Sequence, residues 1–495
     1  MTSTSQPDLS GLIKAYDVRG VVPDPFSPEV ARAIGAAFAE VVVLGVEHAE
    51  RPGVVVGRDM RETGPALVTA FAEGVTSRGV DVQLIGLCST DGLYHASGSL
   101  GLPGAMFTAS HNPAEYNGIK MCHAGARPVG EGAGLDTVRE RAGQLLAEGI
   151  GDPMTSPGRV TEHDTLAEYA AFLRSLVDLG AGRALRVVVD AGNGMAGLTV
   201  PAVLGTAAGL PALPLEIVPL YFELDGSFPN HEANPLEPAN LRDLQAAVVE
   251  HGADLGLAFD GDADRCFVVD ERGEPVSPSA VTALVGLREV ARELAEGREP
   301  TVIHNLITSR VVPDLLTAAG ARTVRTRVGH SFIKAEMAAN DAVFGGEHSA
   351  HYYFRDFFFA DTGMLAAMHV IAALTQARAA DGTPLTMSQL AEAYEPYVAS
   401  GEINSRVADV AAARERVVEA YVTQQGGGPV EVDELDGLTV SHWDAHPQWW
   451  FNLRASNTEP LLRLNVEAAD EDIMIKVRDD VLSLVREGTG EEETA

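Results

Sequence analysis

One pattern of apolar and polar positions recurs three times along the chain. A run of branched apolar residues ends in a polar turn at Val54–Val56, Val187–Val189 and Val302–Ile303. Such runs predict parallel strands that are buried on both faces. A helical stretch and a second strand follow each run, the strands being expected at 80–87, 215–220 and 323–328. The pattern therefore predicts three similar α/β units, each with a crossover of the usual right-handed kind.

The chain after residue 384 has a different pattern. Short strands without long helices between them are expected at 430–434, 438–443, 449–455 and 461–466. That pattern is typical of a smaller α+β domain. The predicted fold class is thus α/β, with three similar mixed or parallel domains and a C-terminal α+β domain. Segments rich in proline and glycine place the domains at 1–158, 159–270, 271–384 and 385–495.

Composition and charge restrict the class of protein. The 495 residues have 46% hydrophobic content and a formal net charge of −34, which indicates a well-cored globular chain and argues against a nucleic-acid partner. The three cysteines, Cys88, Cys122 and Cys266, form no CxxC pair, which excludes a cysteine zinc site and suits a reducing compartment. Neither a signal peptide nor a membrane span is visible, so we expect a cytoplasmic protein without a membrane partner.

The segment Thr108–Pro113 follows an apolar run, so Ser110 lies where a strand gives way to a loop. An ordinary serine–asparagine turn with a proline would have the same composition. A nucleophilic serine beside polar and cationic neighbours, notably Lys120, is the functional alternative. A serine hydrolase is a third alternative, but no GxSxG elbow surrounds Ser110.

Three aspartates, Asp260, Asp262 and Asp264, alternate with small residues between two apolar runs. Carboxylates so spaced repel one another unless a cation neutralises them, and hard oxygen ligands suit Mg²⁺. An EF-hand is excluded, because the sixth position of its loop would be Arg265 instead of glycine. The flanking segments are also predicted to be strands, whereas an EF-hand loop joins two helices. An exposed acidic turn remains the simpler alternative.

Two further segments carry recognition chemistry. The segment Gly345–His351, with Gly329-His330 before it, offers the donors and acceptors that a sugar hydroxyl needs, although a glycine-rich turn would look similar. The segment Arg454–Pro460 combines an arginine fork with hydroxyl groups and turn amides, which favours anion binding over a plain turn. This anion-binding segment, which we call the phosphate clamp, is separate from the reactive serine. Its presence indicates a substrate that carries its own phosphate.

Together these four segments resemble the motifs of the α-D-phosphohexomutases, in the same order and over nearly the whole chain. The matching forms are Ser-His-Asn-Pro, Asp-Gly-Asp-x-Asp-Arg, Gly-Glu-x-Ser-x-His and Arg-x-Ser-Asn-Thr-Glu-Pro. The last two are most like the phosphomannomutase/phosphoglucomutase branch. The resemblance implies four domains around a central cleft.

The resemblance also implies a role for each matching position. Ser110 is implied as the phosphoserine, whose phosphoryl oxygen completes a Mg²⁺ site made by Asp260, Asp262 and Asp264. Residues that lie beside the reacting phosphoryl group or take part in proton transfer are implied at Arg19, Lys120, Arg265, His330 and His351. Substrate-binding residues are implied at Tyr16, His111, Glu347, Ser349, Arg454, Ser456, Asn457 and Thr458.

Two positions depart from the family pattern. Many relatives carry a lysine after the first strand of the third domain, where this chain reads Asn305–Arg310 and has Ile307; Arg310 is the candidate replacement. Ala350 stands where the sugar-recognising loop often has glycine.

The implied activity is the interconversion of mannose 6-phosphate and mannose 1-phosphate, with glucose phosphates as a second substrate pair. Mg²⁺ would be the cofactor and a hexose 1,6-bisphosphate the activator and intermediate. The alternatives are a phosphoglucomutase, a metal-dependent sugar phosphatase and a non-catalytic sugar-phosphate-binding protein.

Overall fold

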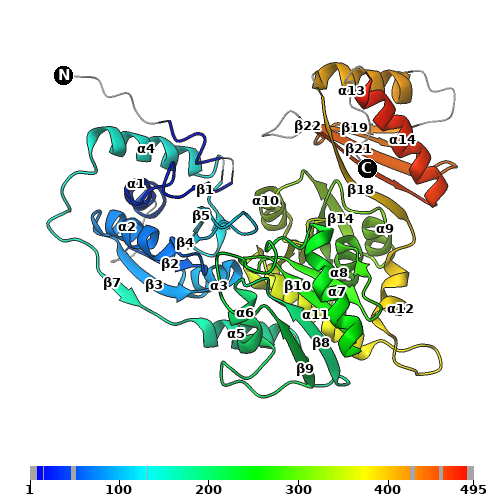
Figure 1. Ribbon diagram of the computed structural model, residues 1–495, viewed down its shortest axis with the longest axis horizontal. Helices are drawn as coiled ribbons and strands as arrows, with labels where there is room; N and C mark the ends of the chain where they lie inside the picture. The colour runs from blue at the N-terminus through cyan, green and yellow to red at the C-terminus, as the bar shows by residue number, and fades with distance from the viewer. Residues whose placement is uncertain are drawn as a thin grey trace.

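The computed structural model describes residues 8–14, 16–45, 52–130, 132–407, 409–423, 430–455 and 461–487. Four β-sheets follow one another along the chain. In Figure 1 the blue and cyan elements of the first sheet lie on the left, the green and yellow elements fill the centre, and the orange and red elements of the fourth sheet lie at the upper right. The prediction of three α/β units followed by a smaller α+β unit is confirmed.

The first sheet has the strand order β1-β5-β4-β2-β3-β7, with β6 beside β5. The predicted strand around Val54–Val56 is β2, which pairs in parallel with both β3 and β4. The strands are β1 (Val18–Val21), β2 (Gly53–Arg58), β3 (Asp81–Leu87), β4 (Gly104–Phe107), β5 (Tyr116–His123), β6 (Arg127–Pro128) and β7 (Val160–Glu162). The helices are α1 (Pro28–Phe38), α2 (Gly64–Thr76), α3 (Thr90–Leu100) and α4 (Leu135–Glu148).

The second sheet has the order β12-β11-β10-β8-β9. Its strand β8 pairs in parallel with β9 and β10, as the run Val187–Val189 predicts. The strands are β8 (Leu185–Asp190), β9 (Leu215–Leu220), β10 (Leu255–Phe259), β11 (Cys266–Asp270) and β12 (Pro275–Val276). The helices are α5 (Leu166–Leu176), α6 (Ala196–Val203) and α7 (Arg242–His251).

The third sheet has the order β14-β13-β15-β16-β17, and β13 again pairs in parallel with its two neighbours. Its strands are β13 (Thr301–Asn305), β14 (Arg322–Thr326), β15 (Phe344–Gly346), β16 (Tyr352–Phe354) and β17 (Ala360–Asp361). The helices are α8 (Pro278–Ala295), α9 (Val311–Ala318), α10 (His330–Asn340), α11 (Gly363–Gln376) and α12 (Met387–Ala391).

The fourth sheet is antiparallel, with the order β18-β22-β21-β20-β19. It contains the four predicted strands and one that the sequence did not indicate, β18. The strands are β18 (Val398–Arg406), β19 (Glu431–Asp433), β20 (Leu438–Ser441), β21 (Trp449–Ala455) and β22 (Leu461–Ala468). The helices α13 (Val410–Val418) and α14 (Glu471–Arg486) bury Val417 and Val481 against this sheet.

The hydrophobic cores show which units are bound to each other. Residues of the second and third units form one continuous core, to which nearly all of α11 contributes. The fourth unit has a separate core of its own, and most apolar residues of the first unit form another. The second and third units therefore form one block, against which the first and fourth units are placed.

Three expectations concern the chain as a whole. The three cysteines are buried and free. None of the helices in the described part of the chain combines the length and the apolar character that a bilayer crossing requires. The domain boundaries stay predictions, and β7 of the first sheet follows the boundary expected at residue 158.

Candidate active site

Ser110 lies in the loop between β4 and β5, which we call the serine loop (residues 108–115). Its backbone N–H donates to Thr108 Oγ1 at 2.9 Å, and its φ of 49° is in the left-handed region. This conformation directs the hydroxyl group to the second unit, where Ser110 Oγ donates to Asp260 Oδ2 at 2.8 Å. Two motifs that the sequence keeps far apart are thus in direct contact.

The three aspartates lie in the acidic loop (residues 260–265), which joins the antiparallel strands β10 and β11. All three side chains are buried, and one carboxylate oxygen of each lies within 4.8 Å of the others. This burial excludes the alternative of an exposed acidic turn. The flanking strands agree with the rejection of an EF-hand, whose loop joins two helices.

Two cations already approach the acidic loop. Lys120 Nζ, from β5, lies 2.7 Å from Asp262 Oδ2 and 2.5 Å from Asp264 Oδ2. Arg265 Nε lies 2.8 Å from Asp260 Oδ2, and its Nη2 lies 3.5 Å from Ser110 Oγ. Arg265 thus reaches the serine hydroxyl itself, while Lys120 pairs with the other two carboxylates of the loop.

The acidic loop also fits a divalent cation. Asp262 Oδ1 and Asp264 Oδ1 are buried and accept no hydrogen bond in the structure. A buried carboxylate oxygen without a hydrogen bond carries a desolvation cost, which a metal ion would remove. Two such oxygens beside a third carboxylate are the hard donor set that Mg²⁺ prefers.

The pKa values in this loop are shifted in opposite directions. Burial and the two neighbouring carboxylates raise the pKa of Asp260 above its ordinary value, although Arg265 opposes them. Burial also disfavours the charged form of Asp264, but Lys120 and His351 outweigh it and hold the pKa of that carboxyl well below its ordinary value. Asp260 and Asp264 thus differ in how readily their carboxyl groups ionise.

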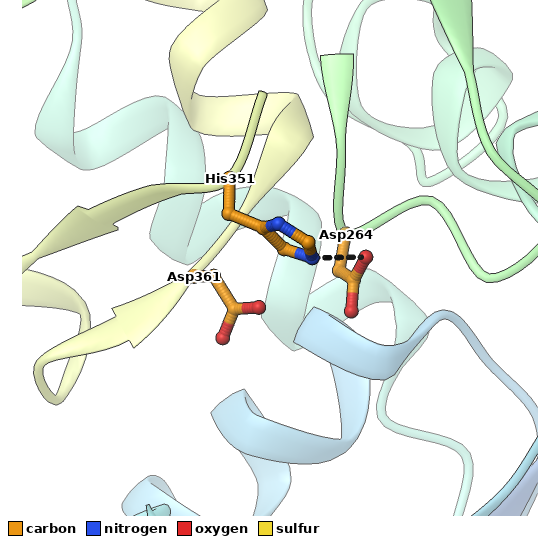
Figure 2. A group of neighbouring side chains, drawn as sticks. All are labelled: Asp264, His351 and Asp361. Atoms are coloured by element: carbon orange, nitrogen blue, oxygen red, sulfur yellow. Dashed lines mark ion pairs between the residues drawn. The ribbon is translucent and has the colours of Figure 1, made fainter. Parts of the chain in front are cut away.

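A second group of titratable residues lies next to the first and shares Asp264 with it. Figure 2 shows the imidazole of His351 directed at Asp264, with Asp361 beside it. His351 Nε2 lies 3.6 Å from Asp264 Oδ1. Asp361 pairs with the buried Lys334 of α10, whose Nζ lies 2.5 Å from Asp361 Oδ1 and 4.0 Å from the centre of the Tyr94 ring. Because Lys334 already neutralises Asp361, this second group does not need a metal ion.

The predicted histidines differ in their charge. Burial, together with Lys334, lowers the pKa of His330 to about 4, so its imidazole is neutral at pH 7. Burial also acts against a charge on His351, but Asp264 outweighs it and raises the pKa of that imidazole above its ordinary value. His111 Nδ1 lies 3.2 Å from Ser110 Oγ, and burial beside Arg265 holds the pKa of His111 well below its ordinary value.

Glu347 and Ser349 lie in the sugar loop (residues 345–351), which joins β15 and β16. Glu347 is buried and accepts hydrogen bonds from Asn305 Nδ2 at 3.0 Å and from the Tyr353 hydroxyl at 2.5 Å. Ser349 Oγ lies 3.0 Å from His351 Nδ1. Ala350 has a φ of 65°, the left-handed conformation in which the family often has glycine.

The N-terminal residues Tyr16 and Arg19 lie beside the same site. Arg19, on β1, donates to Asn112 Oδ1 of the serine loop at 2.6 Å and to Asp17 Oδ2 at 2.7 Å. The Tyr16 ring lies 5.4 Å from the imidazole of His330, measured between ring centres. The first unit thereby contacts the start of α10 in the third unit.

Arg454 lies near the end of β21 in the fourth unit and pairs with Glu402 of β18 at 2.8 Å. The other predicted clamp residues, Ser456, Asn457 and Thr458, lie outside the described residues. Arg310, the candidate for the missing lysine, pairs with Asp314 at 2.8 Å. Ile307 lines a cavity of about 340 Å³ between the third and fourth units.

Sequence reasoning missed several residues that hold this site, among them Lys334, Asp361, Asn305 and Tyr353. Asp361 follows an apolar stretch and precedes a helix, much as Asp260 follows β10, and this signal could have marked it. Asn305 ends a buried strand, which is also a usual place for a functional polar group. Neither Lys334 nor Tyr353 carries a local signal, because only tertiary packing brings them to the site.

Four family models match consecutive parts of the chain. They describe the three α/β/α domains and the C-terminal domain of phosphoglucomutase/phosphomannomutase, and they match residues 11–141, 167–273, 278–397 and 402–484.

Named relatives and a solved structure agree with these models. A phosphomannomutase of Salmonella montevideo is 38% identical over 94% of this chain and 96% of its own length, and one of Escherichia coli K12 is 37% identical over the same shares. The crystal structure of a phosphoglucomutase/phosphomannomutase family protein from Burkholderia thailandensis superposes with a TM-score of 0.81 at 29% identity, covering 98% of this chain and 99% of that one. The chain therefore belongs to the phosphoglucomutase/phosphomannomutase family and is a phosphohexomutase, an isomerase that acts by phosphotransfer.

Proposed function

We propose that the protein is a phosphomannomutase that interconverts mannose 6-phosphate and mannose 1-phosphate, with glucose phosphates as a second substrate pair. The observation that carries this proposal is the contact of Ser110 Oγ with Asp260 in the acidic loop, where Asp260 also pairs with Arg265 and Asp262 pairs with Lys120. A serine so placed is surrounded by the charges that a phosphoryl group needs. The mannose preference is supported by relatives named phosphomannomutase.

The reaction that we propose uses Ser110 as a carrier in two transfers. In the first, a hydroxyl oxygen of the hexose phosphate attacks the phosphorus on Ser110, the bond to Oγ breaks, and the hydroxyl proton passes to a base. Lys120, His330 and His351 are the candidate groups for this proton, because they match the family positions that contact substrate or assist proton transfer. In the second transfer, Ser110 Oγ attacks the other phosphorus of the hexose 1,6-bisphosphate, and the proton returns to the leaving sugar oxygen.

Asp260, Asp262 and Asp264 would hold Mg²⁺, with a phosphoryl oxygen on Ser110 completing the site. When bound, the ion supplies positive charge to the phosphoryl oxygens during transfer. Arg265 supplies further positive charge at the serine, and Lys120 supplies it at Asp262 and Asp264. Phosphoryl transfer depends mainly on the positioning of the reacting groups and on the neutralisation of their charge. The residues around Ser110 provide both.

The remaining residues would hold the sugar and its second phosphate. Glu347 and Ser349 offer an acceptor and a hydroxyl to two sugar hydroxyl groups. Asn305 and Tyr353 fix the Glu347 carboxylate in place. Arg454, with Ser456, Asn457 and Thr458, would bind the phosphate that is not being transferred, while Tyr16, Arg19, His111 and His351 complete the wall of the site.

The decisive experiment is a competition assay with mannose 1-phosphate and glucose 1-phosphate in the presence of Mg²⁺ and a hexose 1,6-bisphosphate. We expect both 6-phosphates to form, the mannose product faster, and intact-protein mass spectrometry to find a phosphoryl group on Ser110. Ser110→Ala should abolish exchange. Stoichiometric release of inorganic phosphate would favour a phosphatase, and binding without exchange would favour a non-catalytic protein.

A further inference from the structure

Arg61 lies beneath the serine loop and donates to four backbone carbonyl oxygens, three in the loop and one at Tyr116, the first residue of β5. Arg61 Nη1 donates to Pro113 O at 2.7 Å and to Tyr116 O at 2.9 Å. Arg61 Nη2 donates to Ser110 O at 3.0 Å and to Asn112 O at 2.7 Å. One guanidinium group thus holds nearly the whole serine loop, including the backbone of Ser110 itself.

Asp59 fixes this arginine from the other side. Arg61 Nε donates to Asp59 Oδ2 at 3.2 Å, and the backbone N–H of Arg61 donates to Asp59 Oδ1 at 3.0 Å. The backbone N–H of Asp59 donates to Phe107 O at the end of β4. A guanidinium has five N–H donors, and all five are used here. Only 1% of Arg61 is exposed, so its role is within the protein and not in binding substrate.

The serine loop needs such support because its own conformation is unfavourable. It contains no helix or strand, and Ser110 adopts a positive φ of 49°. For a residue other than glycine this conformation is sterically unfavourable, because Cβ lies too close to the following carbonyl oxygen. The hydrogen bond from Arg61 to Ser110 O helps to hold that conformation, which in turn sets the 2.8 Å contact between Ser110 Oγ and Asp260.

The same arginine connects the loop to two other parts of the site. Asn112, whose carbonyl oxygen Arg61 binds, accepts a hydrogen bond from Arg19 with its side chain. From the second unit, the Phe228 ring lies 5.2 Å from Arg61 Cζ, and a Cβ atom on Gly226 would lie only 2.7 Å from Arg61 Cα. Arg61 therefore lies where the serine loop, β1 and the second unit meet.

We propose that Arg61 is a positioning residue for phosphoryl transfer, which acts by holding the backbone of the serine loop and never touches the substrate. This proposal rests on the proposed role of Ser110 as the phosphate carrier. It predicts that loss of the guanidinium lowers the rate of transfer to and from Ser110 much more than it lowers substrate affinity. Glu347 and Ser349, the proposed ligands of the sugar hydroxyl groups, lie in the sugar loop of the third unit, which Arg61 does not hold.

The test compares Arg61→Lys and Arg61→Met with a matched control, Arg174→Met. Arg174 of α5 also donates to three backbone carbonyl oxygens, those of Val203, Gly205 and Pro211, but its loop lies outside the site. For each variant we would measure kcat and KM for mannose 6-phosphate, and the rate at which glucose 1,6-bisphosphate phosphorylates Ser110. Circular dichroism would establish folding.

We expect kcat and the phosphorylation rate to fall about 100-fold in both Arg61 variants, because a displacement of the reacting group by about 1 Å has an effect of this size. The KM should change by less than about threefold, since the guanidinium does not touch the substrate. Lysine should not rescue, because it keeps the charge but cannot bind four carbonyl oxygens at once. Arg174→Met should keep its kcat. A folded Arg61→Lys with the kcat of wild type would overturn the proposal.

The remaining outcomes separate a failure of this proposal from a failure of the proposed function. Should neither Arg61 variant fold, Asp59→Asn is measured instead, because it keeps Arg61 but removes the charge that holds Nε; an unchanged kcat there would overturn the proposal. If wild-type protein accepts no phosphoryl group on Ser110 from the bisphosphate, then the proposed function is wrong. If wild type is phosphorylated and Arg61→Lys behaves like it, only the role of Arg61 is wrong.

Discussion

Glu402 Oε2 accepts a hydrogen bond from Arg454 Nη2 at 2.8 Å, and Glu402 Oε1 accepts one from Arg463 Nη1 at 3.0 Å. One carboxylate on β18 thus neutralises the arginine that we propose as the phosphate clamp. A substrate phosphate must compete with this carboxylate for Arg454, so Glu402 weakens phosphate binding. The same carboxylate also pairs with Arg463 and so reduces the repulsion between the two arginines.

We therefore predict that Glu402→Gln tightens substrate binding. The pair is partly exposed, and such pairs contribute up to about 1 kcal/mol, which corresponds to a Kd for mannose 6-phosphate about two- to fivefold lower. Isothermal titration calorimetry would measure this Kd with and without Glu402→Gln, in proteins that also carry Ser110→Ala. Glu434→Gln, which removes the partner of Arg414 in the same unit, is the matched control and should leave Kd unchanged. A higher Kd in Glu402→Gln would contradict a clamp role for Arg454.

A second prediction concerns the acidic loop. Asp262→Asn should lower kcat by about 10²–10³-fold, because one charge that faces the transferring group is lost in a buried site. Mg²⁺ titration followed by calorimetry should show weaker binding in this variant, and treatment with EDTA should abolish activity in wild type.

The control for this experiment is Asp254→Asn. Asp254 precedes β10, at the opposite end of the strand from the acidic loop, and pairs with Arg183 at 2.7 Å. Its loss should affect stability without changing Mg²⁺ affinity. Full activity of EDTA-treated wild type would show that the acidic loop has no metal role.

The sequence predicted the serine, acidic and sugar loops because each concentrates its chemistry within a few residues after a buried strand. Lys334 and Asp361 were missed because each is a single polar residue whose partner is supplied by packing. Strand β18 was missed because its residues are small, polar and mostly exposed, so that its apolar alternation is weak. The contact between Ser110 and Asp260 depends on how two units dock, which no local pattern encodes.

A third prediction concerns pH and the junction of three units. Asp91, at the start of α3, is buried and accepts hydrogen bonds from Tyr169 at 2.7 Å and from Thr362 at 2.6 Å, as well as from Ser89. Burial, with a contribution from Asp264, raises the pKa of Asp91 to about 6. The folded state therefore holds this proton more tightly than the unfolded state does.

The sign of the effect follows from that difference. The stability that Asp91 contributes is present at low pH and is lost as the pH rises from about 4 through about 6, by up to about 3 kcal/mol. Asp91→Asn lacks the titrating group, so the melting temperature of wild type should fall relative to the variant between pH 4.5 and pH 7.5. Thermal melts at both pH values would measure this, and a constant difference would contradict the raised pKa.

The last prediction concerns the buried pair of Lys334 and Asp361. Because both groups are almost fully buried, Asp361→Asn leaves an ammonium ion without its counter-charge, and we expect a loss of about 3–5 kcal/mol in the free energy of unfolding. The double variant Lys334→Met/Asp361→Asn removes both charges and should recover much of that loss.

Activity should respond differently from stability. Lys334 contributes to the low pKa of His330, and Asp361 is one of the two carboxylates grouped with His351, so the double variant should stay impaired in kcat even where its fold is restored. The comparison requires denaturant melts and kcat for both single variants and the double variant, as in a double-mutant cycle. If the double variant recovered kcat together with stability, the pair would serve the fold alone, and its place beside the two histidines would carry no consequence for proton transfer.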